Sequence, residues 1–324
     1  MKIFSPLATL LMLASLTGFQ AQAGSRQVID ANGQSQSVPD APRRVVVLSE
    51  LDLDSALTLG VQPVGTVNGR GQSTLPRYLL DKAGKEIAVV GDLDNPNLET
   101  LIDLEPDLIL TGQTKPELLA LLKEIAPTVV TGNWGEPWKT VFGRSADAMN
   151  RGAEAKAFLT RYEARLAEAR SKLAQHQGEQ MSIVRWNPKG PSYMHGGTFA
   201  SSVVTEMGLT RPSHQIGDKS PHSPALSLES LNLLDGDWLV IGTLSTSGDA
   251  VDAMKQAEQT PAFQQLGAIK GKRFGAVDGS LWTSTGGPQA ALKVIDDVER
   301  LLTKPDAAPS LTKPPRFTAN KKPA

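Results

Sequence analysis

The sequence LETLIDLEPDLILTG at residues 98–112 returns as LESLNLLDGDWLVIG at residues 228–242. Six residues, namely Leu, Glu, Leu, Leu, Asp and Gly in chain order, are identical at matching positions with a constant offset of 130 residues. The leucine spacing predicts an amphipathic helix, and the apolar run that follows it predicts a buried strand. A period of this length is too long for a solenoid, so it indicates two lobes of similar build.

Strands and short helices are expected to alternate on both sides of these copies. Before residue 140, strands are expected at 43–50, 63–67, 87–90, 107–111 and 128–131, and helices at 52–59, 98–104 and 116–125. After residue 178, strands are expected at 181–186, 192–195, 237–242 and 273–277, and helices at 199–207, 226–234, 251–265 and 288–302. Such alternation is typical of parallel α/β sheets.

The stretch between the two regions has a different pattern. Residues 145–174 contain no proline, and Phe158, Tyr162, Leu166 and Leu173 recur at helical spacing, which predicts one long amphipathic helix. We therefore predict an α/β protein of two Rossmann-like lobes, at 24–143 and 178–303, joined by a single long helix at 144–177. Ligands of such folds bind at the carboxyl ends of strands, so we expect the site in a cleft between the lobes.

Both ends of the chain have their own composition. Residues 1–23 combine Lys2, an apolar run and the sequence Ala21-Gln22-Ala23, which predicts a cleavable secretory signal and an exported protein. The chain contains no cysteine, which excludes disulfides and a lipid-anchoring cysteine at the cleavage site. Residues 304–324 are rich in proline and cations, so we expect a flexible tail.

Charge and motifs argue against two broad classes of function. Lys and Arg number 33 against 34 Asp and Glu, and this balance disfavours a nucleic-acid binder. The sequence lacks G-x-S-x-G, P-loop, G-x-G-x-x-G and H-E-x-x-H motifs, so no enzyme is indicated. A secreted hydrolase whose Ser, His and Asp are distant in sequence stays open as an alternative.

Several residues are candidates for ligand contacts. Arg185 lies in an apolar strand, where its charge is costly unless it forms an ion pair or faces a cleft, and Arg70 lies in a glycine-flanked loop. Trp134 and Trp138 follow a predicted strand, so they either face the cleft or cover the long helix. Tyr193 is more ordinarily a core residue of its strand.

Histidines support a rival interpretation. His195, His214 and His222 are expected in loops of the second lobe that face the cleft. Together with an acid such as Asp92 they could hold a bare divalent metal, although their spacing matches no local metal motif. Scattered loop histidines are more often surface residues.

Taken together, several segments carry a family resemblance. The predicted signal, residues 42–48 (PRRVVVL), residues 60–65 (GVQPVG) and residues 97–110 (NLETLIDLEPDLIL) are similar to those of periplasmic substrate-binding proteins of ABC importers. The chain resembles in particular the helical-backbone subclass, class III, which collects ferric siderophores, haem and cobalamin. Residues 184–186 (VRW) and 207–212 (MGLTRP) look most like the ferric-siderophore branch.

The resemblance implies a carrier, without catalysis or a cofactor of its own. It implies that the ligand is a ferric siderophore, whose chelator fills the iron shell so that no protein side chain binds the metal directly. It also implies a monomer that docks on an ABC permease dimer in the inner membrane through one glutamate per lobe, here Glu99 and Glu229. The alternative within this class is a carrier of free divalent metal or haem.

The resemblance also suggests which residues face the ligand. The position of Trp282 resembles one that carries an aromatic in ferrichrome-binding relatives, whereas Asp92-Leu93-Asp94 stands where some of them place an arginine, which argues against ferrichrome itself. The residues expected to contact the ligand are Arg70, Trp134, Trp138, Arg185, Trp186, Tyr193, His195, His222 and Trp282.

Overall fold

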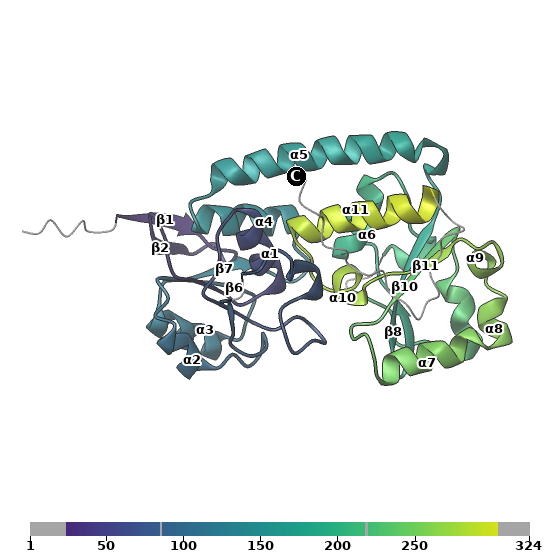
Figure 1. Cartoon of the computed structure of the whole chain (residues 1–324), viewed down its shortest axis with the longest axis horizontal. Coiled ribbons are helices and arrows are strands. Elements are labelled where there is room, and N and C mark those ends of the chain that lie inside the picture. Colours follow the sequence, from purple (N-terminus) through teal and green to yellow (C-terminus); the bar gives the residue numbers. More distant parts are fainter. Residues whose placement is uncertain (1–23, 85, 218–219, 304–324) are drawn as a thin grey trace, which may run out of the picture.

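The computed structural model describes residues 24–84, 86–217 and 220–303, which form two α/β lobes side by side (Figure 1). The predicted signal at 1–23 and the predicted tail at 304–324 lie outside the described residues. Within those ranges, no helix combines the length and the apolar character needed to cross a bilayer.

The N-terminal lobe is built on a five-stranded parallel sheet. Its strands lie in the order β5-β4-β3-β6-β7. This order reverses direction at β3, and such switch points are where ligands bind in α/β sheets. The strands are β3 (Val45–Val47), β4 (Gly65–Thr66), β5 (Ala88–Val89), β6 (Leu108–Gly112) and β7 (Thr128–Gly132).

Helices and a hairpin complete this lobe. The helices are α1 (Glu50–Thr58), η1 (Arg77–Leu79), α2 (Leu98–Asp103), α3 (Pro116–Ile125) and α4 (Trp138–Ala148). An antiparallel hairpin of β1 (Ser25–Ile29) and β2 (Ser35–Pro39), which the sequence patterns did not indicate, packs on α4 and β7.

The C-terminal lobe has a four-stranded sheet of order β11-β10-β8-β9. Three strands are parallel, but β9 is antiparallel to β8, so the expectation of a wholly parallel sheet is wrong here. The strands are β8 (Met181–Asn187), β9 (Gly190–Tyr193), β10 (Trp238–Gly242) and β11 (Phe274–Ala276). The helices are α6 (Phe199–Glu206), η3 (Ser213–Gln215), η4 (Leu228–Leu234), α7 (Asp249–Glu258), α8 (Pro261–Gln264), α9 (Gly267–Lys270), α10 (Gly279–Trp282) and α11 (Pro288–Thr303).

The two copies of the repeat take equivalent places in the two sheets. Each forms a short helix that leads into a strand, α2 into β6 and η4 into β10. The first helix is α-helical, with the Asn97 side chain accepting a hydrogen bond from the Thr100 amide at 3.0 Å, whereas the second is a 3₁₀ helix without a side-chain cap. The repeat thus marks corresponding positions in the lobes, while local capping differs.

The connection between the lobes differs from the predicted helix over 144–177. Helix α4 ends at Ala148, and Asn150 has a left-handed φ of 55°, so the chain turns before α5 (Gly152–Lys172) begins. After α5 a short 3₁₀ segment, η2 (Ala174–His176), follows. The apolar periodicity continues across this turn, which is why the sequence suggested one helix.

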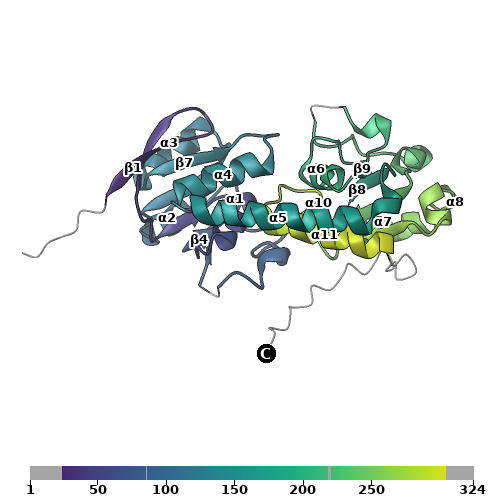
Figure 2. The same ribbon diagram turned by 90° about the horizontal axis from the view of Figure 1, so that it is seen from above.

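A second helix also joins the lobes. Helix α11 runs alongside α5 (Figures 1 and 2), and Arg165 of α5 pairs with Asp296 at 2.8 Å and Glu299 at 2.6 Å. The first turn of α11 lies against α1 of the N-terminal lobe. One hydrophobic cluster contains residues of both lobes, α5 and α11, so the expected single rod is a pair of helices over a shared core.

Candidate functional site

Two arginines from opposite lobes define the candidate site, which we call the interlobe site. Arg70 follows β4 in the N-terminal lobe, and Arg185 lies near the carboxyl end of β8. Arg185 is only 5% exposed; its Nη1 donates to the Thr283 carbonyl at 3.4 Å, and its Nε has no hydrogen-bond partner. Burial and then the charge of Arg70 lower the pKa of Arg185, so the two guanidinium groups lie within electrostatic reach of each other.

This arrangement favours an anion. Neither guanidinium forms a salt bridge with any residue that the structure describes. Two cations near each other, one of them buried, are costly unless a negative charge accompanies them. The planar guanidinium fork pairs with two oxygen atoms at once. The interlobe site can therefore bind an oxygen-rich anionic ligand.

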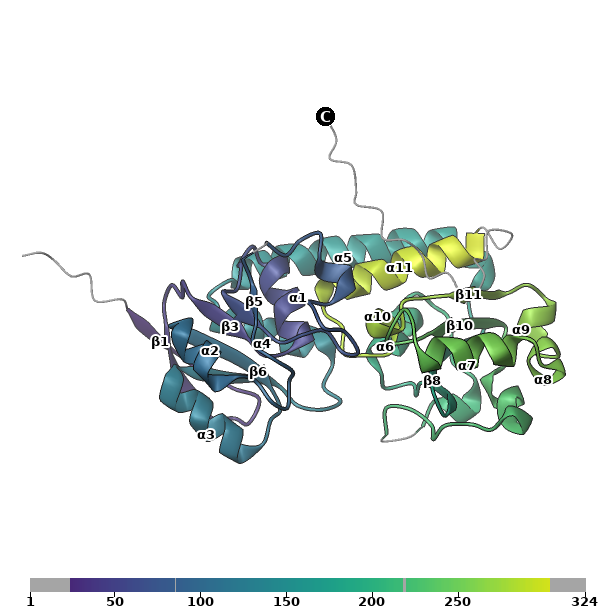
Figure 3. The same cartoon turned by 60° about the horizontal axis from the view of Figure 1, so that its bottom comes forward.

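A salt bridge between the lobes borders the site. Arg77 of η1 contacts Asp278, which follows β11, with 2.6 Å between Nη2 and Oδ1. The same guanidinium donates to the Leu244 carbonyl at 3.0 Å and the Ser280 hydroxyl at 3.1 Å. Figure 3 shows α1 of the N-terminal lobe and α10 of the C-terminal lobe near the boundary between the two lobes. The sequence offered no sign of this pair, because its members are 201 residues apart.

Helix α1 brings three buried carboxylates, Glu50, Asp52 and Asp54, which the sequence analysis did not single out. Asp52 accepts hydrogen bonds from the hydroxyls of Ser49 at 2.6 Å, Ser145 at 2.7 Å and Thr131 at 2.9 Å. Burial raises the pKa of Asp52. Acids near a helix start are usually at the surface, so their pattern alone does not indicate burial.

Asp54 holds the first turn of α11. Its carboxylate accepts hydrogen bonds from the amides of Gln289 at 2.8 Å and Ala290 at 3.0 Å. These amides have no partner within their own helix, so an acid from the other lobe caps it. Burial raises the pKa of Asp54 to about 6, although these hydrogen bonds oppose the shift.

Trp134 is an exposed aromatic side chain at the same sheet edge as Arg70. It follows β7 and is 66% exposed. Gly135 turns the loop with a φ of 81°, and the salt bridge between Glu136 and Arg144 at 2.7 Å ties the loop to α4. The strand order puts β7 three strand spacings from β4, roughly 14 Å. Arg70 and Trp134 thus follow two strands of the same parallel sheet.

Three tryptophans expected at the ligand are core residues instead. Trp282 is fully buried, and its Nε1 donates to Asp297 of α11 at 3.0 Å. Trp138 and Trp186 are also buried, and their rings contact Tyr162 and Phe263. Their burial does not support the assignment of these three side chains as ligand contacts, which stays a prediction. Trp138 begins α4 and Trp282 ends α10, so positions taken for open loops turn into the packed core.

The residues of β9 and its following loop are mostly enclosed. His195 is 3% exposed and its Nδ1 donates to the Ser220 carbonyl at 2.7 Å, so its burial does not support its assignment as a ligand contact, which stays a prediction. Tyr193 is half-buried against the rings of His195 and His214. His222 is half-buried and hydrogen-bonds the Ser223 carbonyl at 2.8 Å. In the described ranges, no three His, Cys, Asp or Glu residues are grouped to hold a metal ion.

Glu99 and Glu229 are both exposed. They lie in the first turns of α2 and η4, at matching positions of the two lobes. Their role in docking stays a prediction.

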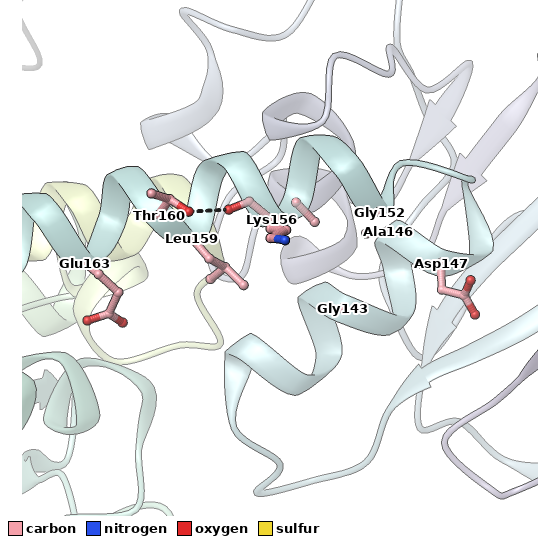
Figure 4. Close-up of a pocket in the computed structure, with 9 residues that line it drawn as sticks. Gly143, Ala146, Asp147, Gly152, Lys156, Leu159, Thr160 and Glu163 are labelled. Atoms are coloured by element: carbon pink, nitrogen blue, oxygen red, sulfur yellow. Dashed lines mark hydrogen bonds between the residues drawn. The ribbon is translucent and has the colours of Figure 1, made fainter.

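A pocket of about 510 Å³ lies between α4 and α5, away from the two arginines (Figure 4). Its walls include Ala146, Ala155 and Leu159, and its cation Lys156 is accompanied by the acids Asp147 and Glu163. This mixed charge does not favour an anion.

Two α/β lobes with facing strand ends, braced by long helices, define a two-lobed binding protein. Residues 45–280 match the model of the family described as periplasmic binding protein. The chain belongs to this family, and the predicted class III fold is confirmed.

Relatives and solved structures agree with this assignment. The chain is 29% identical over 290 residues to the probable siderophore-binding lipoprotein YfiY of Bacillus subtilis, covering 86% of this chain and 88% of YfiY. It is 28% identical to the achromobactin-binding periplasmic protein of Dickeya dadantii, covering 80% and 86% of the two chains. Staphylococcus aureus SirA, solved with staphyloferrin B, shares the fold with a TM-score of 0.75 and 23% identity, covering 86% of this chain and 98% of SirA.

Proposed function

We propose that this protein captures a ferric siderophore outside the cytoplasm and delivers it to an ABC importer. The observation that carries the proposal is that Arg70 and Arg185, from opposite lobes, lie near each other and that neither guanidinium forms a salt bridge with a described residue. The siderophore-related names of the relatives support the same ligand class.

The ligand we propose is an anionic ferric chelate. Its oxygen atoms would pair with the two guanidinium groups, and its body would contact Trp134. Because the chelator already surrounds the iron, such a ligand needs no metal-binding side chains from the protein.

We further propose that Glu99 and Glu229 dock the loaded protein on the importer. Matching positions on two lobes fit a partner of two similar halves, and exposed carboxylates fit basic pockets on such a partner. Ligand capture and docking would then use separate surfaces.

A fluorescence titration tests the ligand class. Trp134 is the exposed tryptophan at the sheet edge, so we expect ferric citrate to quench emission saturably and a neutral ferric trihydroxamate to bind more weakly. Replacement of Trp134 by Phe should remove most of the quenching. Saturation by bare Mn²⁺ or Zn²⁺, with no response to any ferric chelate, would contradict the proposal and favour a free-metal carrier.

A further inference from the structure

We propose that Glu50 is a positioning residue that sets the separation of Arg70 and Arg185 across the interlobe site. The inference rests on the proposed function, because it concerns how the same site accepts an anionic ligand.

The carboxylate of Glu50 joins the two lobes. Glu50 begins α1 and is 8% exposed. Its Oε1 accepts the backbone amide of Arg70 at 2.5 Å, and its Oε2 accepts the hydroxyl of Ser284 at 2.9 Å. Arg70 belongs to the N-terminal lobe and Ser284 to the segment that follows α10, so a single side chain ties a loop of each lobe.

The second tie leads directly to Arg185. Ser284 follows Thr283, whose carbonyl accepts the hydrogen bond from Arg185 Nη1. A continuous path of hydrogen bonds and covalent bonds therefore runs from the Arg70 backbone through Glu50, Ser284 and Thr283 to the Arg185 guanidinium, and its last hydrogen bond is 3.4 Å long. A change in the Glu50 carboxylate would alter the position of both arginines together.

Charge gives Glu50 a second effect on the site. The carboxylate of Glu50 lies near Arg70, so its negative charge offsets the positive charge of Arg70. The positive charge of Arg70, in turn, lowers the pKa of Arg185. The groups that face Glu50 are Arg70 from the loop after β4, Ser284 and Asp278 from the C-terminal lobe, and Tyr78 from η1. Burial raises the pKa of Glu50, while its two hydrogen bonds and the charge of Arg70 oppose the shift.

Asp52 supplies a matched control on the same helix. It is also buried and lacks a basic partner among the described residues, and burial raises its pKa as well. Its hydrogen bonds, however, go to Ser49, Thr131 and Ser145, all within the N-terminal lobe. A general effect of neutralising a buried acid would appear in both variants, whereas a positioning effect would appear for Glu50 alone.

The experiment compares Glu50→Gln, Asp52→Asn and the unmodified protein in fluorescence titrations with ferric citrate at pH 7.5 and 5.5. We expect Glu50→Gln to weaken binding by roughly tenfold or more at pH 7.5 and Asp52→Asn to leave it unchanged. The gap between Glu50→Gln and the unmodified protein should be smaller at pH 5.5 than at pH 7.5, because burial raises the pKa of Glu50 and a lower pH favours its protonated form. A purely structural role would not produce this convergence.

A ligand-free measurement keeps the test decisive. Hydrogen exchange of the Arg70 amide, which donates to Glu50, should be faster in Glu50→Gln and unchanged in Asp52→Asn. If Glu50→Gln does not fold, Ser284→Ala replaces it and should weaken binding about threefold.

Equal affinity and equal Arg70 exchange in the variant and the unmodified protein would overturn the positioning role. If the unmodified protein does not bind ferric citrate, the proposed ligand class fails, and the exchange measurement still decides the role of Glu50.

Discussion

The two lobes share a framework but differ in the charges that they bury without a salt bridge. Asp278 of the C-terminal lobe is buried in a salt bridge with Arg77. Otherwise the N-terminal lobe buries the acids Glu50, Asp52 and Asp54 on α1, whereas the C-terminal lobe buries Arg185 and Arg211. None of these five residues forms a salt bridge within the described part of the chain. The buried charged side chains of both lobes are therefore stabilised mainly by hydrogen bonds to neutral groups.

The comparison separates structural charges from a binding charge. Asp52 and Asp54 are satisfied by hydroxyls and amides, and Arg211 donates to the carbonyls of Met181 and Met194 and to Gln215. Arg185 differs, because its guanidinium makes one polar contact, 3.4 Å long, whereas that of Arg211 makes three. A buried charge that lacks partners within the protein is the one we expect to bind the ligand.

The largest expected effect tests what the lobes have in common. Replacing Glu99 and Glu229 together by Ala should abolish uptake of the ferric chelate in cells, because both proposed docking carboxylates are lost. Each single variant should impair uptake if the lobes dock equivalently. Affinity measured on the purified double variant should be unchanged, and a loss of affinity would contradict the docking assignment.

The next effect contrasts the two buried arginines. Arg185→Met should weaken ferric citrate binding by about 2–4 kcal/mol, roughly 30- to 1,000-fold, without lowering stability. Arg211→Met should instead lower the free energy of unfolding by about 2–4 kcal/mol, because three buried acceptors lose their donor. Titration and denaturant unfolding of both variants measure this contrast. Equal behaviour of the two variants would show that Arg185 is also structural.

A smaller effect concerns the acids of the N-terminal lobe. The folded pKa of Asp54, about 6, lies above its ordinary value of 3.8, so the folded state binds more protons than the unfolded chain between about pH 4 and 6. The free energy of unfolding should therefore rise as pH falls from 7 to 5, by ~1.3 kcal/mol from this group. Urea unfolding at both pH values should show that Asp54→Asn loses this increment, while the exposed variant Asp103→Asn keeps it. An unchanged pH dependence in Asp54→Asn would contradict the assignment.

The smallest effect tests the pocket between α4 and α5 against the interlobe site. Gly143 lies in α4, is exposed, and has open space where a Cβ would stand. Gly143→Ala should raise the free energy of unfolding by about 0.5–1 kcal/mol through helix propensity and leave chelate affinity unchanged. Weaker binding in this variant would place the ligand in the pocket.

Local patterns predicted much of the fold. The bounds of α3 were predicted without error, and the repeat located β6 and β10 because apolar periodicity reports local burial. The turn at Asn150 was missed because the apolar spacing continues through it, and an isolated left-handed residue leaves no periodic mark.

A site residue could be predicted only where its type differs from that of its sequence neighbours, as a charged residue in an apolar strand does. Arg185 stood out because a charge in an apolar strand is costly. Glu50 and Asp54 look like ordinary acids near a helix start, and the partners that they contact in the C-terminal lobe lie more than 200 residues away in the chain. Trp282 follows a strand as a ligand-facing residue would, but packing of α10 against α11 buries it. Such outcomes depend on tertiary packing, which spacing does not encode.

The most direct test of the account is a crystal structure of the protein soaked with ferric citrate, with the iron located by anomalous scattering. The account predicts one iron position between the lobes, with chelator oxygens on the guanidinium groups of Arg70 and Arg185. Iron bound in the pocket between α4 and α5, or held directly by histidines of the C-terminal lobe, would contradict it.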